Sequence, residues 1–181
     1  MHDRGKRRIR ESYDSLGGRL YDIRYQIEQD VKYDVILRRS PPSLEKIVLD
    51  DGCGTGLLLK RLGNTCVGVD LSHHLLSKAR SRLRKKRRIH LIQADADLLP
   101  FRDRVFGEVF AVTLIQNTPN PEHSLSEMRR VARAGSEVVV TALKKAFTLQ
   151  GLKQLLEASG LALTSIIQDE ELKDWIAFTI Q

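Results

Sequence analysis

Cysteine and long apolar runs are both scarce in this sequence. The chain has 181 residues and two cysteines, Cys53 and Cys66, which form no CxxC pair and have no close histidine partner. Two such cysteines cannot build a zinc site and do not indicate a disulfide framework, so we expect no metal. Apolar runs such as residues 109–112 are far shorter than the roughly 20 residues that cross a bilayer. No apolar stretch follows the basic first residues, so we expect no signal peptide, no membrane segment and a cytoplasmic location.

The composition is typical of a globular protein with excess positive charge. Hydrophobic residues make up 41%, which excludes general disorder, and the length suits one domain with its own core. Lys and Arg total 30 against 23 Asp and Glu, a formal net charge of +7. We predict a basic flexible arm at residues 1–10. Residues 78–88 hold eight basic residues and no acid, which indicates either a solvated face or a phosphate-binding surface.

Short apolar runs alternate with helical patterns along most of the chain. Strands are predicted at residues 46–50, 66–70, 89–94, within 105–115, and at 137–143, 161–168 and 175–180. Helices are predicted after position 57, after the capping residue Ser72, and at 124–134 and 148–159. This alternation predicts βαβ units, and therefore a mostly parallel sheet with helices on both faces. Such sheets bind ligands at the carboxyl ends of their strands.

An N-terminal helical segment precedes the first strand. Apolar residues recur there every three or four positions, which predicts one helix or two short ones within residues 11–40. The residues of this predicted inward stripe are Leu16, Leu20, Ile23, Ile27, Val31 and Val35.

A glycine-rich loop follows the first strand. Asp50 precedes Gly52, Gly54 and Gly56, and alternate glycines let a backbone turn sharply and approach a ligand. A dinucleotide loop of the form GxGxxG would need its third glycine at position 57 or 59, where the chain has leucine. The GxGxG spacing instead resembles motif I of the class I S-adenosylmethionine-dependent methyltransferases.

Three later segments extend that resemblance over residues 13–181. Asp70 ends the second strand, where the family's motif II carboxylate accepts hydrogen bonds from ribose hydroxyls, and Asp95 ends the third, where the family binds adenine. Residues 98–106 resemble the LPFxDxxF signature of the methyltransferase type 11-like family, although Gly107 stands where an aspartate is usual. The resemblance implies S-adenosylmethionine as cofactor, held by Asp50, Gly52, Cys53, Gly54, Gly56, Asp70, Leu71, Asp95 and Ala96.

The same resemblance implies the overall architecture and a lid. It predicts a Rossmann-like fold with a doubly wound, mostly parallel seven-stranded sheet, formed by a single domain over residues 11–181. Residues 11–40 would be N-terminal lid helices. Tyr13 lies in a segment similar to the family's lid and would bond the cofactor carboxylate, with Tyr21 as second choice; ordinary helix packing is the alternative for both.

The acceptor side is expected after the fourth strand. Residues 114–121 stand at motif IV, and we interpret Gln116 and Asn117 as polar groups that face the methyl acceptor. His123 is either a base or part of a helix cap. Neither cysteine is placed for a nucleophilic role, because Cys53 belongs to the glycine loop and Cys66 to the second strand.

The charge pattern favours RNA as acceptor, either tRNA or rRNA. The expected contacts are Arg82, Arg84, Lys85, Lys86, Arg87 and Arg88. A small-molecule methyltransferase and a protein methyltransferase remain alternatives. A further alternative is a noncatalytic cofactor-binding subunit, and the unpaired third strand would offer a small adaptor protein a place to pair.

Overall fold

The computed structural model describes residues 18–181, with side chains from residue 26 onward. A seven-stranded sheet has the order β3-β2-β1-β4-β5-β7-β6. Its strands are β1 (Ile47–Asp51), β2 (Thr65–Asp70), β3 (Ile89–Gln93), β4 (Phe106–Ala111), β5 (Ala132–Leu143), β6 (Ala162–Ile167) and β7 (Asp174–Ile180). The helices are α2 (Gly18–Arg39), α3 (Leu57–Arg61), α4 (His73–Arg82), η1 (Ile115–Asn117), α5 (Pro121–Val131) and α6 (Leu149–Ala158).

The sheet is parallel except at β7. Strands β1 to β5 pair in parallel, and β7 runs antiparallel to both β5 and β6. The strand order reverses between β1 and β4, so the carboxyl ends of these central strands form the topological switch point. The predicted Rossmann-like, mostly parallel seven-stranded fold is confirmed.

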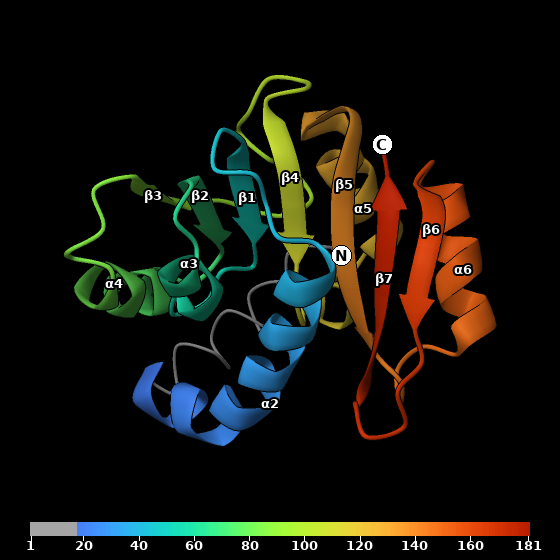
Figure 1. The fold of residues 1–181 in the computed structure, drawn as a ribbon, viewed down its shortest axis with the longest axis horizontal. Helices are drawn as coiled ribbons and strands as arrows, with labels where there is room; N and C mark the ends of the chain where they lie inside the picture. The colour runs from blue at the N-terminus through green and yellow to red at the C-terminus, as the bar shows by residue number, and fades with distance from the viewer. Residues whose placement is uncertain (1–17) are drawn as a thin grey trace.

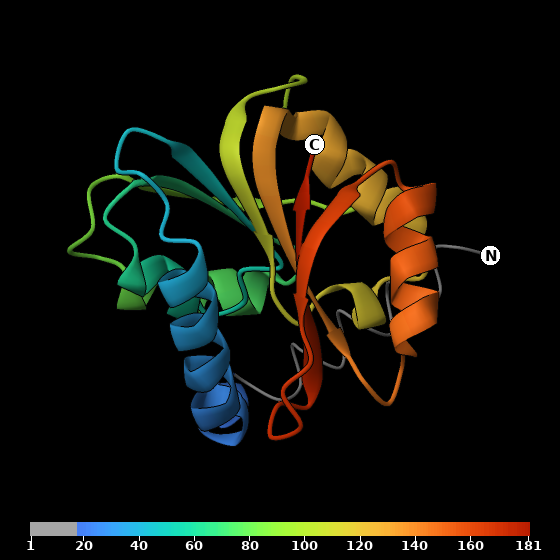
Figure 2. The same ribbon diagram turned by 45° about the vertical axis from the view of Figure 1, so that its right-hand side comes forward.

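Helices cover both faces of the sheet and create two apolar layers (Figures 1 and 2). Side chains of α5 and α6, including Leu125, Met128 and Leu152, pack on one face. Ile36 of α2 and Leu58 of α3 pack on the other, together with side chains of α4. Strand β4 lies between these layers and is buried along its whole length. This rigid centre fixes the positions of the loops at its carboxyl end.

Local capping explains where several helices begin. The Ser72 hydroxyl accepts a hydrogen bond from the Leu75 amide at 3.2 Å, as predicted. Asn120 caps α5 by accepting from the His123 amide at 3.3 Å, with Pro121 in the first turn. His123 itself is exposed. The predicted end of α6 is also confirmed, because Gly160 has φ +73° directly after it.

The predicted inward stripe of α2 is wrong at two positions. Ile27 is 82% exposed and Val31 is 46% exposed, whereas Val35 is half-buried against the core. The side chains of Leu16, Leu20 and Ile23 lie outside the described part of the chain. From residue 26 onward, the buried residues of the helix are Gln29, Lys32, Tyr33 and Ile36. The buried set keeps helical spacing but is rotated, because α2 lies over polar groups at the carboxyl end of the sheet. Among the described residues, no helix is long and apolar enough to cross a membrane.

Candidate functional site

The glycine loop turns sharply at the end of β1. Gly52, Gly54 and Gly56 have φ values of +78°, +54° and +77°, which L side chains rarely adopt. The amides of Gly52 and Cys53 both donate to the Val69 carbonyl, at 2.9 and 2.8 Å. A Cβ atom on Gly56 would lie 2.7 Å from the Leu83 side chain. The loop is therefore held against β2 and α4 in a form that requires glycine.

Asp70 joins the loop to α4. One carboxylate oxygen accepts from the Gly54 amide and the other from the Ser72 amide, both at 2.8 Å. A carboxylate oxygen can accept more than one hydrogen bond, so these two bonds are compatible with a further contact to a ligand. Leu71, the next residue, is half-buried, and its carbonyl accepts from Gln93 of β3 at 3.1 Å. The predicted ribose-binding carboxylate is thus fixed at the carboxyl end of β2.

Arg82 supports the loop from α4. Its guanidinium donates to the Thr55 carbonyl at 2.5 Å. Arg82 is one of the predicted RNA contacts, and this bond ties its side chain to the glycine loop, so its contact with RNA stays a prediction. The sequence alone does not distinguish Arg82 from its neighbours, because it is one of eight basic residues between positions 78 and 88.

A tight turn follows β3. The Asp95 carboxylate accepts from the Asp97 amide at 3.0 Å, and Asp95 forms an isolated bridge with Leu98. Ser124 of α5 donates to Asp97, and Ala96 is buried between these acids. The turn thereby presents Asp95 and Ala96, the predicted adenine contacts, beside the end of β2.

The segment from Leu98 to Arg104 is clamped by α5. Arg130 donates to the carbonyls of Phe101 and Leu99 at 2.7 and 3.0 Å, and Glu127 accepts from the Leu99 amide at 2.9 Å. Asp103 pairs with Arg130 at 2.8 Å. The motif that resembles LPFxDxxF is therefore part of the loop between β3 and β4, and its hydrogen bonds to α5 anchor it.

Buried carboxyl groups give this site an acidic interior. Burial, and secondarily the charge of Asp70, raises the pKa of Asp50 to about 8. Burial and the neighbouring acids Asp50, Asp70, Asp95 and Asp97 raise the pKa of Asp51 well above its ordinary range. Neither Asp51 oxygen has a hydrogen-bond partner among the described residues. Asp51 is not among the residues predicted to hold the cofactor, although two adjacent acids on a central strand are a visible signal.

The cysteine in the loop is inert. Cys53 is buried, and burial together with Asp50, Asp70 and Asp51 raises the pKa of its thiol well above the ordinary value. Cys66 is also free and buried. A thiol that stays protonated is a poor nucleophile, which agrees with the exclusion of cysteine chemistry.

The predicted acceptor residues lie on η1, just after β4. The Asn117 amide donates to the Thr113 carbonyl at 2.9 Å. The Gln116 Oε1 atom is buried and accepts no hydrogen bond within the described part of the chain. Gln116 therefore retains an unused acceptor at the switch point, whereas Asn117 has a local structural bond. Tyr13 lies outside the described residues, as does the basic arm, and the side chain of Tyr21 is likewise not described.

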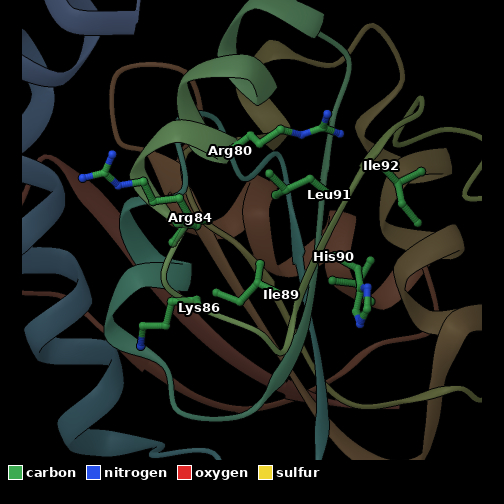
Figure 3. Close-up of a pocket in the computed structure, with 9 residues that line it drawn as sticks. Arg80, Arg84, Lys86, Ile89, His90, Leu91 and Ile92 are labelled. Carbon is green, nitrogen blue, oxygen red and sulfur yellow. The ribbon is translucent and has the colours of Figure 1, made fainter.

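The basic segment connects α4 to β3, which is an edge strand of the sheet. Residues 84–88 are all exposed, and Lys86 also donates to the Leu62 carbonyl at 2.8 Å. A cavity of about 680 Å³ lies between this segment and β3. Figure 3 shows Arg80, Arg84 and Lys86 around it, with Ile89 and Leu91 directed toward the helix side. In the described residues β3 pairs with β2 alone, so its other edge is open.

Comparisons with known proteins place the chain in a family. The methyltransferase domain family matches residues 49–140. The chain is 40% identical over 98 residues to a phosphatidylethanolamine N-methyltransferase of Cereibacter sphaeroides, covering 51% of this chain and 48% of the relative. It is 29% identical over 133 residues to a tRNA U34 carboxymethyltransferase of Aliivibrio fischeri, covering 68% and 41%. The chain spans about half the length of the curated relatives it matches.

A solved structure shares the fold over nearly the whole chain. It is a putative methyltransferase in complex with the Haloferax volcanii Trm112 methyltransferase activator, with a TM-score of 0.81 and 15% identity. The match covers 93% of this chain and 96% of the other. From the family match and the geometry of the glycine loop, the chain belongs to the class I S-adenosylmethionine-dependent methyltransferases of the methyltransferase domain family, whose cofactor is S-adenosylmethionine.

Proposed function

We propose that this protein transfers the methyl group of S-adenosylmethionine to RNA. The observation that carries the proposal is an exposed basic segment at the amino end of β3, in the same domain whose β1 to β3 carboxyl ends carry the glycine loop and three acids. Methyl transfer needs a positioned donor, and RNA binding needs closely spaced cations. The family match supports the first half, and the charge distribution supports the second.

The residues at the carboxyl ends of β1 to β3 fit this cofactor. S-adenosylmethionine carries a positive sulfonium, and no cation of the described residues lowers the pKa of the buried acids Asp50 and Asp51. Asp70 would accept from the ribose hydroxyls, and Asp95 from the adenine amino group, with the Ala96 amide near a ring nitrogen. Gly52, Cys53, Gly54, Gly56 and Leu71 would line the methionine and ribose portions, and Tyr13 would contact the carboxylate from the lid.

Positioning is the main chemical task of this chain. When bound, the cofactor supplies an electrophilic methyl group and a neutral thioether leaving group. The unused Gln116 oxygen would accept a hydrogen bond from the acceptor's N–H or O–H group and hold that atom in line. Asn117 would keep the η1 turn in place through its bond to Thr113. A dedicated base is not required, because the acceptor's proton can pass to water.

The basic turn, defined as residues 84–88, would hold the RNA backbone. All five of its cations are exposed, and four of them, Arg84, Lys85, Arg87 and Arg88, donate no side-chain hydrogen bond to the described part of the chain. Closely spaced cations gain affinity by releasing counterions from nucleic acid, so binding must weaken as salt rises. Lys86 and Arg82 contribute less, because each donates to a backbone carbonyl of its own chain.

An activating partner is a second proposal, favoured by the open edge of β3. Ile89 and Leu91 are half-buried beside the cavity, and an extended strand added there would cover them and pair with the free backbone groups. A putative methyltransferase of matching fold was solved in complex with the Haloferax volcanii Trm112 methyltransferase activator. Co-purification with a candidate activator should be lost in Ile89→Asp/Leu91→Asp, while the cofactor affinity stays unchanged; retention of the partner would refute this surface.

The experiment for the main proposal follows a radioactive methyl group. The protein is incubated with tritiated S-adenosylmethionine and with RNA, protein and metabolite fractions. We expect label in RNA, and at least tenfold less in Arg84→Glu/Lys85→Glu. The control Lys145→Glu/Lys153→Glu changes the net charge by the same amount at exposed positions outside the basic turn, and it should retain RNA labelling. Label confined to protein or metabolites would refute RNA as acceptor, and equal labelling by both double variants would refute the basic turn.

A further inference from the structure

The residue that precedes η1 has a strained backbone. Thr113 has φ +62°, a left-handed conformation that is uncommon for a β-branched side chain. It lies between β4 and the turn that carries Gln116 and Asn117. Strain of this kind persists only where the surroundings fix the residue, and it is most common at functional sites.

Four hydrogen bonds fix Thr113. Its hydroxyl oxygen accepts hydrogen bonds from the Lys32 ammonium at 2.9 Å and from the Gln29 side-chain amide at 3.0 Å, and both donors belong to α2. Its own amide donates to the Thr141 hydroxyl of β5 at 2.8 Å. Its carbonyl accepts from Asn117 at 2.9 Å. Three separate parts of the chain therefore converge on one residue.

Lys32 is an unusual residue to find in this place. The side chain is fully buried, and its ammonium lies 2.7 Å from the equally buried Asp174 at the start of β7. Glu28, one helical turn away, lies 3.2 Å from the same ammonium. A buried ion pair is costly to desolvate and is a poor way to stabilise a fold, so its retention points to a geometric role.

We propose that Lys32 is a positioning residue for the acceptor turn. It acts through Thr113, by holding the hydroxyl so that the backbone stays left-handed and the carbonyl faces Asn117. Asp174 fixes the ammonium in this place. The inference rests on the proposed role of Gln116 and Asn117 at the acceptor. It makes the conformation of the η1 turn depend on the packing of α2 against the sheet.

The test removes the ion pair without leaving a lone buried charge. Lys32→Met/Asp174→Leu replaces both partners by apolar side chains, and adding Thr113→Gly supplies a residue that adopts positive φ freely. Three readouts are measured: hydrogen exchange of amides 113–118, the single-turnover rate at saturating cofactor and acceptor, and the affinity for S-adenosylmethionine. Lys173→Met, which removes an exposed partner of Glu28, is the control.

We expect the double variant to exchange amides 113–118 at least tenfold faster and to transfer methyl at least tenfold more slowly, with cofactor affinity within twofold. Thr113→Gly should recover most of both losses. A double variant that matches the wild type, or a triple variant with no recovery, would overturn the proposal. Gln29→Met removes one hydrogen-bond donor to Thr113 and leaves the ion pair intact, so it should raise the exchange rates of the same amides by a smaller factor. Unchanged exchange rates in Gln29→Met would count against the proposal. The exchange readout is independent of the acceptor, so it separates this inference from the RNA proposal.

Discussion

Asp50 should make the stability of the cofactor-free protein fall as pH rises. An aspartate has an ordinary pKa of 3.8, and burial together with Asp70 raises the pKa of Asp50 to about 8. Between these values the folded protein holds a proton that the unfolded chain releases. The stabilisation is complete below pH 3.8 and is lost as pH rises toward 8. Each pH unit in this window corresponds to about 1.4 kcal/mol.

The perturbation is Asp50→Asn, which keeps the size of the side chain and cannot ionise. Between pH 4.5 and 7.5 the wild type should lose about 4 kcal/mol more unfolding free energy than this variant. Removal of the Asp50 charge also lowers the pKa of Asp51, because the negative charge of Asp50 is one of the causes that raise it. The measured difference therefore belongs to the coupled pair of carboxyl groups.

Urea unfolding at several pH values measures this difference. The exposed substitution Glu45→Gln serves as control and should follow the wild-type slope. Saturating S-adenosylmethionine should flatten the wild-type slope, because a bound cation favours the ionised carboxylates. S-adenosylhomocysteine lacks the sulfonium charge and should flatten it less. Parallel pH slopes for the wild type and Asp50→Asn would refute the reasoning.

Three further predictions concern the same end of the sheet. Gly56→Ala should cost about 3 kcal/mol of unfolding free energy by urea denaturation, because the residue has φ +77° and its Cβ would lie 2.7 Å from Leu83; a cost below about 1 kcal/mol would contradict this. Arg82→Met should weaken cofactor binding about fivefold in calorimetry by freeing the Thr55 carbonyl; unchanged affinity argues against loop support. Both buried thiols should react with a thiol reagent at least roughly 100-fold more slowly in the native protein than in urea, and rapid native labelling would show that they are accessible.

The fold was accessible from the sequence because its signals are local. Strand and helix patterns, the glycines at 52–56 and the cap at Ser72 each depend on nearby residues. Boundaries were less certain. The helix predicted to end at 134 ends at Val131, and β5 begins at Ala132 and not at 137. Ala132 pairs with Phe106 of β4, a tertiary contact that extends the strand and overrides helix propensity.

The parts that sequence reasoning missed depend on contacts between distant residues. The buried face of α2 follows from Thr113 and Asp174, which lie far along the chain. Arg82 appeared to belong to a surface cluster, and only the fold shows its bond to the glycine loop. The roles of Asp70, Asp95 and Gln116 toward ligands, the lid role of Tyr13 and the cytoplasmic location stay predictions.

Calorimetric titration of S-adenosylmethionine into the wild type and Asp70→Ala tests the central claim most directly. Asp70 bonds both the loop and the start of α4, and it is the carboxylate proposed to accept from the ribose hydroxyls. We predict saturable one-site binding by the wild type and at least about 30-fold weaker binding by Asp70→Ala, the loss of about 2 kcal/mol expected for charged hydrogen bonds. The exposed Glu171→Ala should bind like the wild type. Equal affinity of Asp70→Ala and the wild type, or no binding by the wild type, would contradict the account.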